Sequence, residues 1–151
     1  MIRTASPEEL EKVLALQKRA FRSEAVRYDD FNMPPITQSL DEISAESLKY
    51  LILVYETQGD ILGSVRGFID EQNQAHIGRL VVEPGQQRGG IGTQLMEAIE
   101  KEFQKASRFL IFTGAQSEGT IRLYERLGYE KTHLTSAGHY ELIHMHKLNP
   151  A

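Results

Sequence analysis

The sequence predicts a mixed α/β fold, with a mostly antiparallel sheet of six to seven strands flanked by about four helices. Strand-like and helix-like segments follow one another in the order β-α-α-β-β-β-α-β-α-β-β, which differs from the regular alternation of a doubly wound sheet. Short polar turns join the strands of the first half, as in antiparallel hairpins. The 151 residues, 40% hydrophobic and 25% charged, fit one globular domain over residues 1–151.

A capping signal predicts where the first helix begins. After a short strand over residues 1–4, Ser6 and Glu9 have the spacing of a capping box. Pro7 occupies the first helical position, where a proline needs no N–H. Apolar residues then recur at helical spacing through residues 10–21.

A break in this periodicity separates the first helix from a short second one. Residues 24–39 show no helical repeat, and Pro34 with Pro35 predicts that no helix runs through them. The second helix is expected over residues 40–49.

The rest of the chain alternates between strands and helices. Three β-prone runs are expected over residues 50–56, 61–70 and 75–82, the first two joined by a turn. The later elements are a helix over residues 90–106, a strand over 108–114, a helix over 120–127, and strands over 129–134 and 139–148.

Charge and composition exclude several classes of protein. The net charge of −4 argues against a nucleic-acid groove or an anionic membrane surface as the main partner. The chain has no cysteine, so disulfides, thiol nucleophiles and thiolate metal sites are excluded. Since neither a signal peptide nor a membrane-length apolar run is found, a cytoplasmic protein is expected.

Glycines crowd the segment VVEPGQQRGGIG (residues 81–92), which links a strand to the following helix. Free N–H groups and the helix dipole attract anions at a helix N-terminus, and glycine lets a phosphate approach the backbone. The spacing does not fit a Walker A loop, because no Lys-Ser/Thr pair follows Gly90. Nor does it fit a dinucleotide fingerprint, because Leu95 stands where the third glycine belongs. A tight turn without a ligand is the alternative interpretation.

Two blocks together resemble the GNAT superfamily of N-acetyltransferases. Gln87-Arg88-Gly89-Gly90-Ile91-Gly92 matches the Q/R-x-x-G-x-G/A pattern of that family's pyrophosphate loop, and the LVVEP before it is similar to the family's fourth strand. SEGTIRLYERLGYE (residues 117–130) is similar to its later N-x-x-A-I-x-L-Y-x-x-x-G-F/Y signature. The resemblance covers residues 75–130, and it implies that the central fourth and fifth strands splay apart.

The resemblance also implies that acetyl-CoA binds in the gap between those strands. The pantetheine arm would pair with the strand backbone like an added strand, and the pyrophosphate would lie on the glycine loop, with Arg88 adding charge-assisted contacts. The implied residues are Leu80, Val81 and Val82 for pantetheine, and Gln87, Arg88, Gly89, Gly90, Ile91, Gly92 and Thr93 for pyrophosphate. Core packing by the side chains of Leu80 and Val82 is compatible with this, because the implied contacts come from the main chain.

The later signature departs from the family at two positions. Ser117 replaces the usual asparagine and Thr120 the usual alanine. Serine can still hydrogen-bond a pantetheine amide, although with a shorter reach. Tyr124 matches the tyrosine that in relatives points its hydroxyl at the coenzyme A sulfur, which implies a donor to the leaving thiolate. Packing in a core-facing stripe is the alternative for Tyr124.

An amine must lose a proton before it attacks a thioester, so a general base is expected. His76 occupies the strand position where some relatives carry a glutamate; a strand histidine without a catalytic role is the alternative. Glu83, directly after the strand, is the second candidate, with a solvated loop carboxylate as its alternative.

Residues 24–39 correspond to the segment that often lines the acceptor pocket in such enzymes. Glu24, Tyr28 and Asp29, together with Asp30, are therefore the candidate contacts to a cationic acceptor. Simple exposure of the acidic side chains to solvent is the alternative.

The leading interpretation is an N-acetyltransferase that moves an acetyl group from acetyl-CoA to a primary amine by direct attack in a ternary complex. The alternatives are a non-catalytic acetyl-CoA-binding regulatory module and an acyltransferase that uses a longer acyl group. No nucleic acid or membrane is expected as a partner, and relatives commonly form homodimers. No metal is expected, because nothing local completes a site around His144 and His146 on the last strand.

Overall fold

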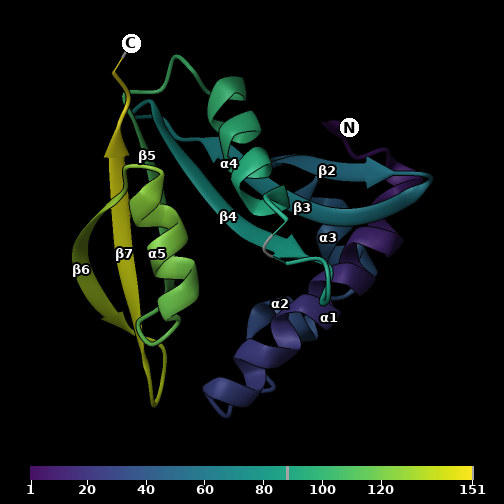
Figure 1. The fold of residues 1–151 in the computed structure, drawn as a ribbon, viewed down its shortest axis with the longest axis horizontal. Helices are drawn as coiled ribbons and strands as arrows, with labels where there is room; N and C mark the ends of the chain where they lie inside the picture. The colour runs from purple at the N-terminus through teal and green to yellow at the C-terminus, as the bar shows by residue number, and fades with distance from the viewer. Residues whose placement is uncertain (88, 151) are drawn as a thin grey trace.

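The computed structural model describes residues 1–87 and 89–150, which form one seven-stranded sheet with helices on both faces (Figure 1). The strands lie in the order β1-β2-β3-β4-β5-β7-β6, and every neighbouring pair is antiparallel except β4–β5. The predicted fold class is confirmed. In chain order the elements are β1 (Ile2–Thr4), the 3₁₀ turn η1 (Pro7–Glu9), α1 (Leu10–Arg27), α2 (Pro34–Thr37), α3 (Leu40–Glu46), β2 (Leu51–Thr57), β3 (Asp60–Ile69), β4 (Gln74–Val82), α4 (Ile91–Glu102), β5 (Arg108–Gly114), α5 (Glu118–Arg126), β6 (Glu130–Ser136) and β7 (Glu141–Leu148).

The sheet separates two apolar layers. Helices α4 and α5 pack on one face, in a cluster that includes Val65, Ile77, Leu95, Ile99, Phe109, Ile121 and Met145. Helices α1 and α3 pack on the other, in a cluster of Leu10, Val13, Leu14, Ile43, Ile52 and Val54. Each buried side chain of this size contributes about 1.5–3 kcal/mol relative to exposure. These layers fix the helices that carry the candidate site.

The element bounds agree with the sequence-based prediction to within two residues, except around the first two expected helices and at the end of α4, which stops at Glu102 rather than at residue 106. Helix α1 runs to Arg27, four residues into the segment expected to be irregular. Pro34 and Pro35 begin the short helix α2, because proline is well tolerated in a first helical turn, where its N–H would have no acceptor. The next helix, α3, ends at Glu46 rather than at residue 49.

Strands β4 and β5 pair only where they begin. Residues 74–76 of β4 pair with residues 108–110 of β5, after which β4 continues to Val82 without further pairing to β5. Figure 1 shows the two strands diverging from that point. On its other edge β4 stays paired with β3, through a β-bulge at Arg79 and Leu80. The splayed central pair that the resemblance implied is therefore present.

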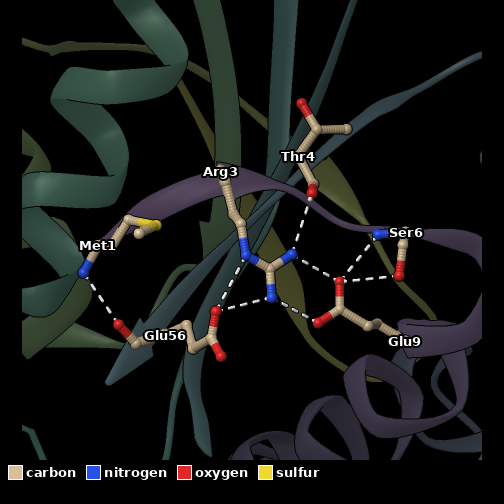
Figure 2. A network of polar contacts seen from close by, with 6 residues as sticks. All are labelled: Met1, Arg3, Thr4, Ser6, Glu9 and Glu56. Carbon is tan, nitrogen blue, oxygen red and sulfur yellow. Dashed lines mark hydrogen bonds and ion pairs between the residues drawn. The ribbon is translucent and has the colours of Figure 1, made fainter. Parts of the chain in front are cut away.

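Arg3 links the first strand to the first helical turn and to strand β2 (Figure 2). Its guanidinium donates to both carboxylate oxygens of Glu9 at 2.6 Å and to Oε1 of Glu56 at 2.7 and 3.0 Å. Glu9 also accepts hydrogen bonds from the backbone N–H and the hydroxyl of Ser6, so the expected pairing of Ser6 with Glu9 forms. These bonds, that from Arg3 first, lower the pKa of Glu9 to about 2.

We expect Glu9→Gln to lower the free energy of unfolding at neutral pH and to have little effect near pH 2. The folded-state pKa of Glu9 lies below its ordinary value of 4.5, so its stabilisation is complete above that value and is lost as the pH falls towards about 2. Urea unfolding at several pH values measures the difference between wild type and variant, which should shrink through this window. Glu11→Gln, at an exposed position in α1, is the control and should show no such trend. A Glu9→Gln difference that is independent of pH would contradict the assignment.

Candidate active site

A cavity of about 460 Å³ lies where β4 and β5 diverge. The end of β4 and helix α5 form one side, and the end of α1, helix α2 and the loop joining β6 to β7 form the other. Several residues expected at the site line it: Leu80, Val81, Val82 and Gln87 from β4 and the glycine loop, Tyr124 from α5, and Glu24 and Tyr28 from α1 or its end. Residues that are distant in the sequence therefore meet at one cavity.

The free edge of β4 presents backbone groups to this cavity. The N–H of Glu83 donates to the carbonyl of Leu62 at 2.8 Å. Because successive peptide groups along a strand point to opposite edges, the N–H of Val82 points away from β3 and into the gap. The side chains of Leu80 and Val82 each approach Gly92 of α4, within 3.8 Å of where a Cβ would stand. The side chain of Val82 thus packs between elements while its main chain faces the gap.

The glycine loop ends in a left-handed residue at the start of α4. Gly90 has φ +85°, a conformation that favours glycine. The N–H of Gln94 donates to the carbonyl of Gly90 at 3.0 Å, so the amides of residues 91–93 precede the first intrahelical bond. Gln87 lines the cavity, whereas Arg88 lies outside the described residues. The loop thus brings helix-terminal donors and the positive end of the helix dipole to the rim of the cavity.

Tyr124 lines the cavity from α5, and its side chain is 5% exposed. Burial, and after it the negative charge of Glu24, raises the pKa of Tyr124 above its ordinary value. The hydroxyl therefore stays protonated at neutral pH and can donate a hydrogen bond. The ring also packs near Tyr129, with the centroids 5.9 Å apart, so Tyr124 combines a packing contact with a place at the cavity.

A buried chain of hydrogen bonds joins the end of α1 to the start of α5. The hydroxyl of Ser117 donates to Oε2 of Glu24 at 2.9 Å and lies 2.7 Å from the hydroxyl oxygen of Tyr28. The Tyr28 hydroxyl in turn accepts a bond from the N–H of Gln116 at 2.9 Å. Ser117 is 0% exposed and does not line the cavity. Its hydroxyl connects two walls, whereas the resemblance implied that it would face pantetheine.

The loop between β6 and β7 packs against Tyr28 and forms another wall of the cavity. The ring of Tyr140 lies 4.6 Å from that of Tyr28, centroid to centroid, and Nε2 of His139 donates to the Tyr28 carbonyl at 2.6 Å. Tyr140 donates to Asp30 at 2.9 Å, and burial together with this bond raises the pKa of Tyr140 to about 12. Asp29 is exposed, and neither aspartate lines the cavity. Of the expected acceptor contacts, the structure brings Glu24 and Tyr28 to the cavity but not the aspartates.

Neither residue that the sequence suggested as a base lines the cavity. His76 lies six residues before Val82, about 20 Å along an extended strand, where β4 still pairs with β5. Its Nε2 contacts Asp70 at 2.8 Å, and its ring stacks on Phe68. The carboxylate of Glu83 is bound by Arg19 at 3.0 and 3.1 Å. The splay begins beyond His76, so that histidine remains at the closed end of the strand pair.

The described residues contain no group of three histidine or acidic side chains arranged to hold a metal ion. His144 stacks on His133, with centroids 4.4 Å apart, and contacts the hydroxyl of Thr135, while His146 lies beside Arg108. In the same part of the chain, no helix has both the length and the apolar character needed to cross a membrane.

Comparison with known proteins identifies the family. Residues 10–129 match the family described as "Acetyltransferase (GNAT) family", and the chain therefore belongs to the GNAT family of N-acetyltransferases. Among solved structures it is similar to the ribosomal-protein-S18-alanine N-acetyltransferase of Escherichia coli, with a TM-score of 0.81 and 19% identity over 100% of this chain and 94% of that one. It is also similar to the PaiA N-acetyltransferase of Thermoplasma acidophilum in complex with coenzyme A, with a TM-score of 0.80 and 18% identity over 98% of each chain.

The chain spans about half the length of the curated relatives that it matches. It is 23% identical over 141 residues to the UPF0157 protein YqkA of Bacillus subtilis, covering 92% of this chain and 40% of that protein. It is 28% identical over 81 residues to a UPF0039 protein of Schizosaccharomyces pombe, covering 53% of this chain and 54% of that protein.

Arg79, Tyr140 and Gly114 are among the lining residues that sequence reasoning missed. Arg79 lines the cavity, and its only local signal is a charge within an otherwise apolar strand. Tyr140 and Gly114 also line it, but the role of each depends on Tyr28, which is far away in the sequence. A Cβ on Gly114 would overlap the ring and hydroxyl of Tyr28, so this glycine allows the tyrosine to reach Ser117.

Gly114→Ala should therefore destabilise the protein, by about 1–3 kcal/mol, because the added methyl group overpacks against Tyr28. Urea or thermal unfolding measures the change. Gly119→Ala is the matched control: it lies in α5 with open space around it, so its stability should be unchanged or slightly higher. Wild-type stability in Gly114→Ala would mean that Tyr28 moves freely and that the described packing does not constrain it.

Proposed function

We propose that this protein transfers the acetyl group of acetyl-CoA to a primary amine by direct attack within a ternary complex. The observation that carries the proposal is the single cavity that joins the free edge of β4 and Tyr124 to Glu24 and Tyr28. Membership of the GNAT family and the coenzyme A complex of the T. acidophilum relative support acetyl-CoA as the cosubstrate.

The cosubstrate would bind along β4 and over the start of α4. The pantetheine arm would lie beside the unpaired part of β4 and pair with its backbone. The pyrophosphate would meet the amides of residues 91–93, with Gln87 nearby. Arg88 would add charge-assisted contacts, as the resemblance implies.

Ser117 takes a positioning role in this proposal, in place of the expected contact with pantetheine. Its hydroxyl donates to Glu24 and is fully buried, so it is committed to holding that carboxylate. The side chain of Glu24 remains 21% exposed and lines the cavity. Within the described residues it is the one carboxylate in the lining, which makes it the contact for a cationic acceptor.

Glu24 also affects the protonation state of the acceptor amine. An alkylamine with a pKa of ~10.4 arrives as an ammonium ion, and a neighbouring carboxylate favours that charged form. The ammonium has no lone pair, so its proton must leave before the nitrogen attacks, to Glu24 itself or through a water in the cavity. His76 and Glu83 lie outside the lining and take no part in this mechanism.

Attack on the thioester produces an oxyanion and then expels the thiolate of coenzyme A. The N–H of Val82 is suitably directed to stabilise the oxyanion. Tyr124 would donate a hydrogen bond to the sulfur as negative charge develops there. Burial raises the pKa of Tyr124, whereas a thiol has a pKa of about 8.5, so complete proton transfer from the phenol is unfavourable. Hydrogen bonding therefore contributes more than proton donation.

Acetyl-CoA should raise the melting temperature, because a ligand of the native state stabilises it by mass action, by about 2.7 kcal/mol at 100 times its Kd. Gly90→Asp should abolish this shift by placing a negative charge beside the pyrophosphate. Gly90→Asn is the matched control, since both variants add a side chain of similar size at φ +85° and differ in charge. The asparagine variant should keep most of the shift. Equal shifts in both variants would contradict the pyrophosphate assignment.

Tyr124→Phe keeps the buried ring and removes only the oxygen. We expect kcat to fall by about 10²–10⁴-fold, with little change in acetyl-CoA affinity or melting temperature. Release of free thiol from acetyl-CoA in the presence of amines measures kcat, and the thermal shift with acetyl-CoA measures binding. Turnover close to that of wild type would make Tyr124 a packing residue and favour a non-catalytic acetyl-CoA-binding module.

A further inference from the structure

Arg79 occupies a strained position in β4. It belongs to the β-bulge and has φ +50°, a left-handed conformation that is unfavourable for a residue with a side chain. Bulges redirect side chains, and strained residues concentrate at functional sites. Here the side chain of Arg79 reaches Gln38, next to α1, and lines the cavity.

The guanidinium of Arg79 has no direct ion pair in the described part of the chain, although the charge of Glu46 acts on it from nearby. Within residues 1–87 and 89–150 it makes one hydrogen bond, from Nη1 to Oε1 of Gln38 at 3.1 Å, and no ion pair. The carboxylate of Glu46, close by, is already bound by Arg66 and by Gln38. Arg66 also lies over the ring of Tyr50, at 4.1 Å from its centroid. This group therefore contains two cations and one carboxylate. Glu46 pairs directly with Arg66, and it acts on Arg79 through its charge, without a hydrogen bond or ion pair.

The charge of Arg79 is retained at neutral pH. Burial, and after it the positive charge of Arg66, lowers the pKa of Arg79 to about 10, which still leaves the guanidinium protonated. A partly buried cation that shares one carboxylate with a second cation is only partly compensated, so it gains from binding a further anion. The planar fork of N–H donors matches a carboxylate in particular. In the described part of the lining, Arg79 is the one cationic residue and Glu24 the one anionic residue.

We propose that Arg79 binds a carboxylate of the acceptor, so that the acceptor is a small molecule with both a primary amine and a carboxylate, as in an amino acid. The inference rests on the proposed function: the ammonium meets Glu24 and the carboxylate meets Arg79. The cavity of about 460 Å³ must also admit the acetyl end of acetyl-CoA. The remaining volume favours a free amino acid over a peptide.

The test compares amino acids with their own carboxamides. A panel of L-amino acids and β-alanine, each paired with its carboxamide, is assayed by thiol release from acetyl-CoA. For the best acceptor, kcat/KM should be about 10- to 100-fold higher for the acid than for the amide, as expected for loss of a charge-assisted bond. Arg79→Gln should bring this ratio close to one without changing the KM for acetyl-CoA, and Arg79→Lys should reduce it in part. Arg22→Gln, which removes an exposed arginine from α1, should keep the wild-type ratio.

A wild-type enzyme that uses amides or diamines as well as amino acids would overturn the inference, and so would an Arg79→Gln variant that keeps the preference for acids. The comparison of acids with amides in the wild-type enzyme tests the inference even if Arg79→Gln does not fold. Calorimetry of N-acetylated amino acids binding to the coenzyme A complex separates this inference from the proposed function. If no amine supports thiol release, yet the wild type binds these compounds and Arg79→Gln does not, the acetyltransferase proposal fails and the carboxylate site stands. If neither the wild type nor Arg79→Gln binds these compounds, the proposed carboxylate site is wrong.

Discussion

The incomplete pairing of β4 with β5 is the constraint on which the rest of the structure depends. Two parallel strands that stayed paired would satisfy each other's backbone groups and close the sheet, but here pairing stops after residues 74–76. The N–H of Val82 then faces a cavity, and a backbone donor without an acceptor is costly, so water or a ligand with amide groups has to bond it. The bulge at Arg79 and Leu80 lets β4 remain bonded to β3 while its other edge stays open.

A gap between strands can bind a ligand specifically only if the elements around it are held in fixed positions. The chain of bonds from Glu24 through Ser117 and Tyr28 to Gln116 joins the end of α1 to the start of α5, although the two helices pack on opposite faces of the sheet. Each hydroxyl in it has both a donor and an acceptor role satisfied, which is what makes a buried polar chain stabilising. Gly114 completes the arrangement, because the ring of Tyr28 lies where a side chain on that residue would be.

The electrostatics of the cavity follow from these positions. Glu24 places a negative charge near Tyr124, and with burial this keeps the phenol neutral and able to donate. Arg79 adds a positive charge from the β4 wall. Charges of both signs interact more strongly in such a site than in water, since little solvent screens them. The same cavity thus holds a donor near the expected sulfur, an anion near the expected amine, and a cation that forms no direct ion pair within the described residues.

The sequence by itself determined the order of the elements, most of their bounds, the glycine loop and the place of Tyr124 in a helix. These features depend on periodicity, turn chemistry and short motifs, whose physical causes act over a few neighbouring residues. The tertiary structure decided which side chains share the cavity. Ser117 bonds to Glu24 across 93 positions in the chain, and no local pattern records that contact. His76 and Val82 belong to one strand, but the pairing register with β5 puts the first at the closed end and the second at the gap, because the strands separate between them.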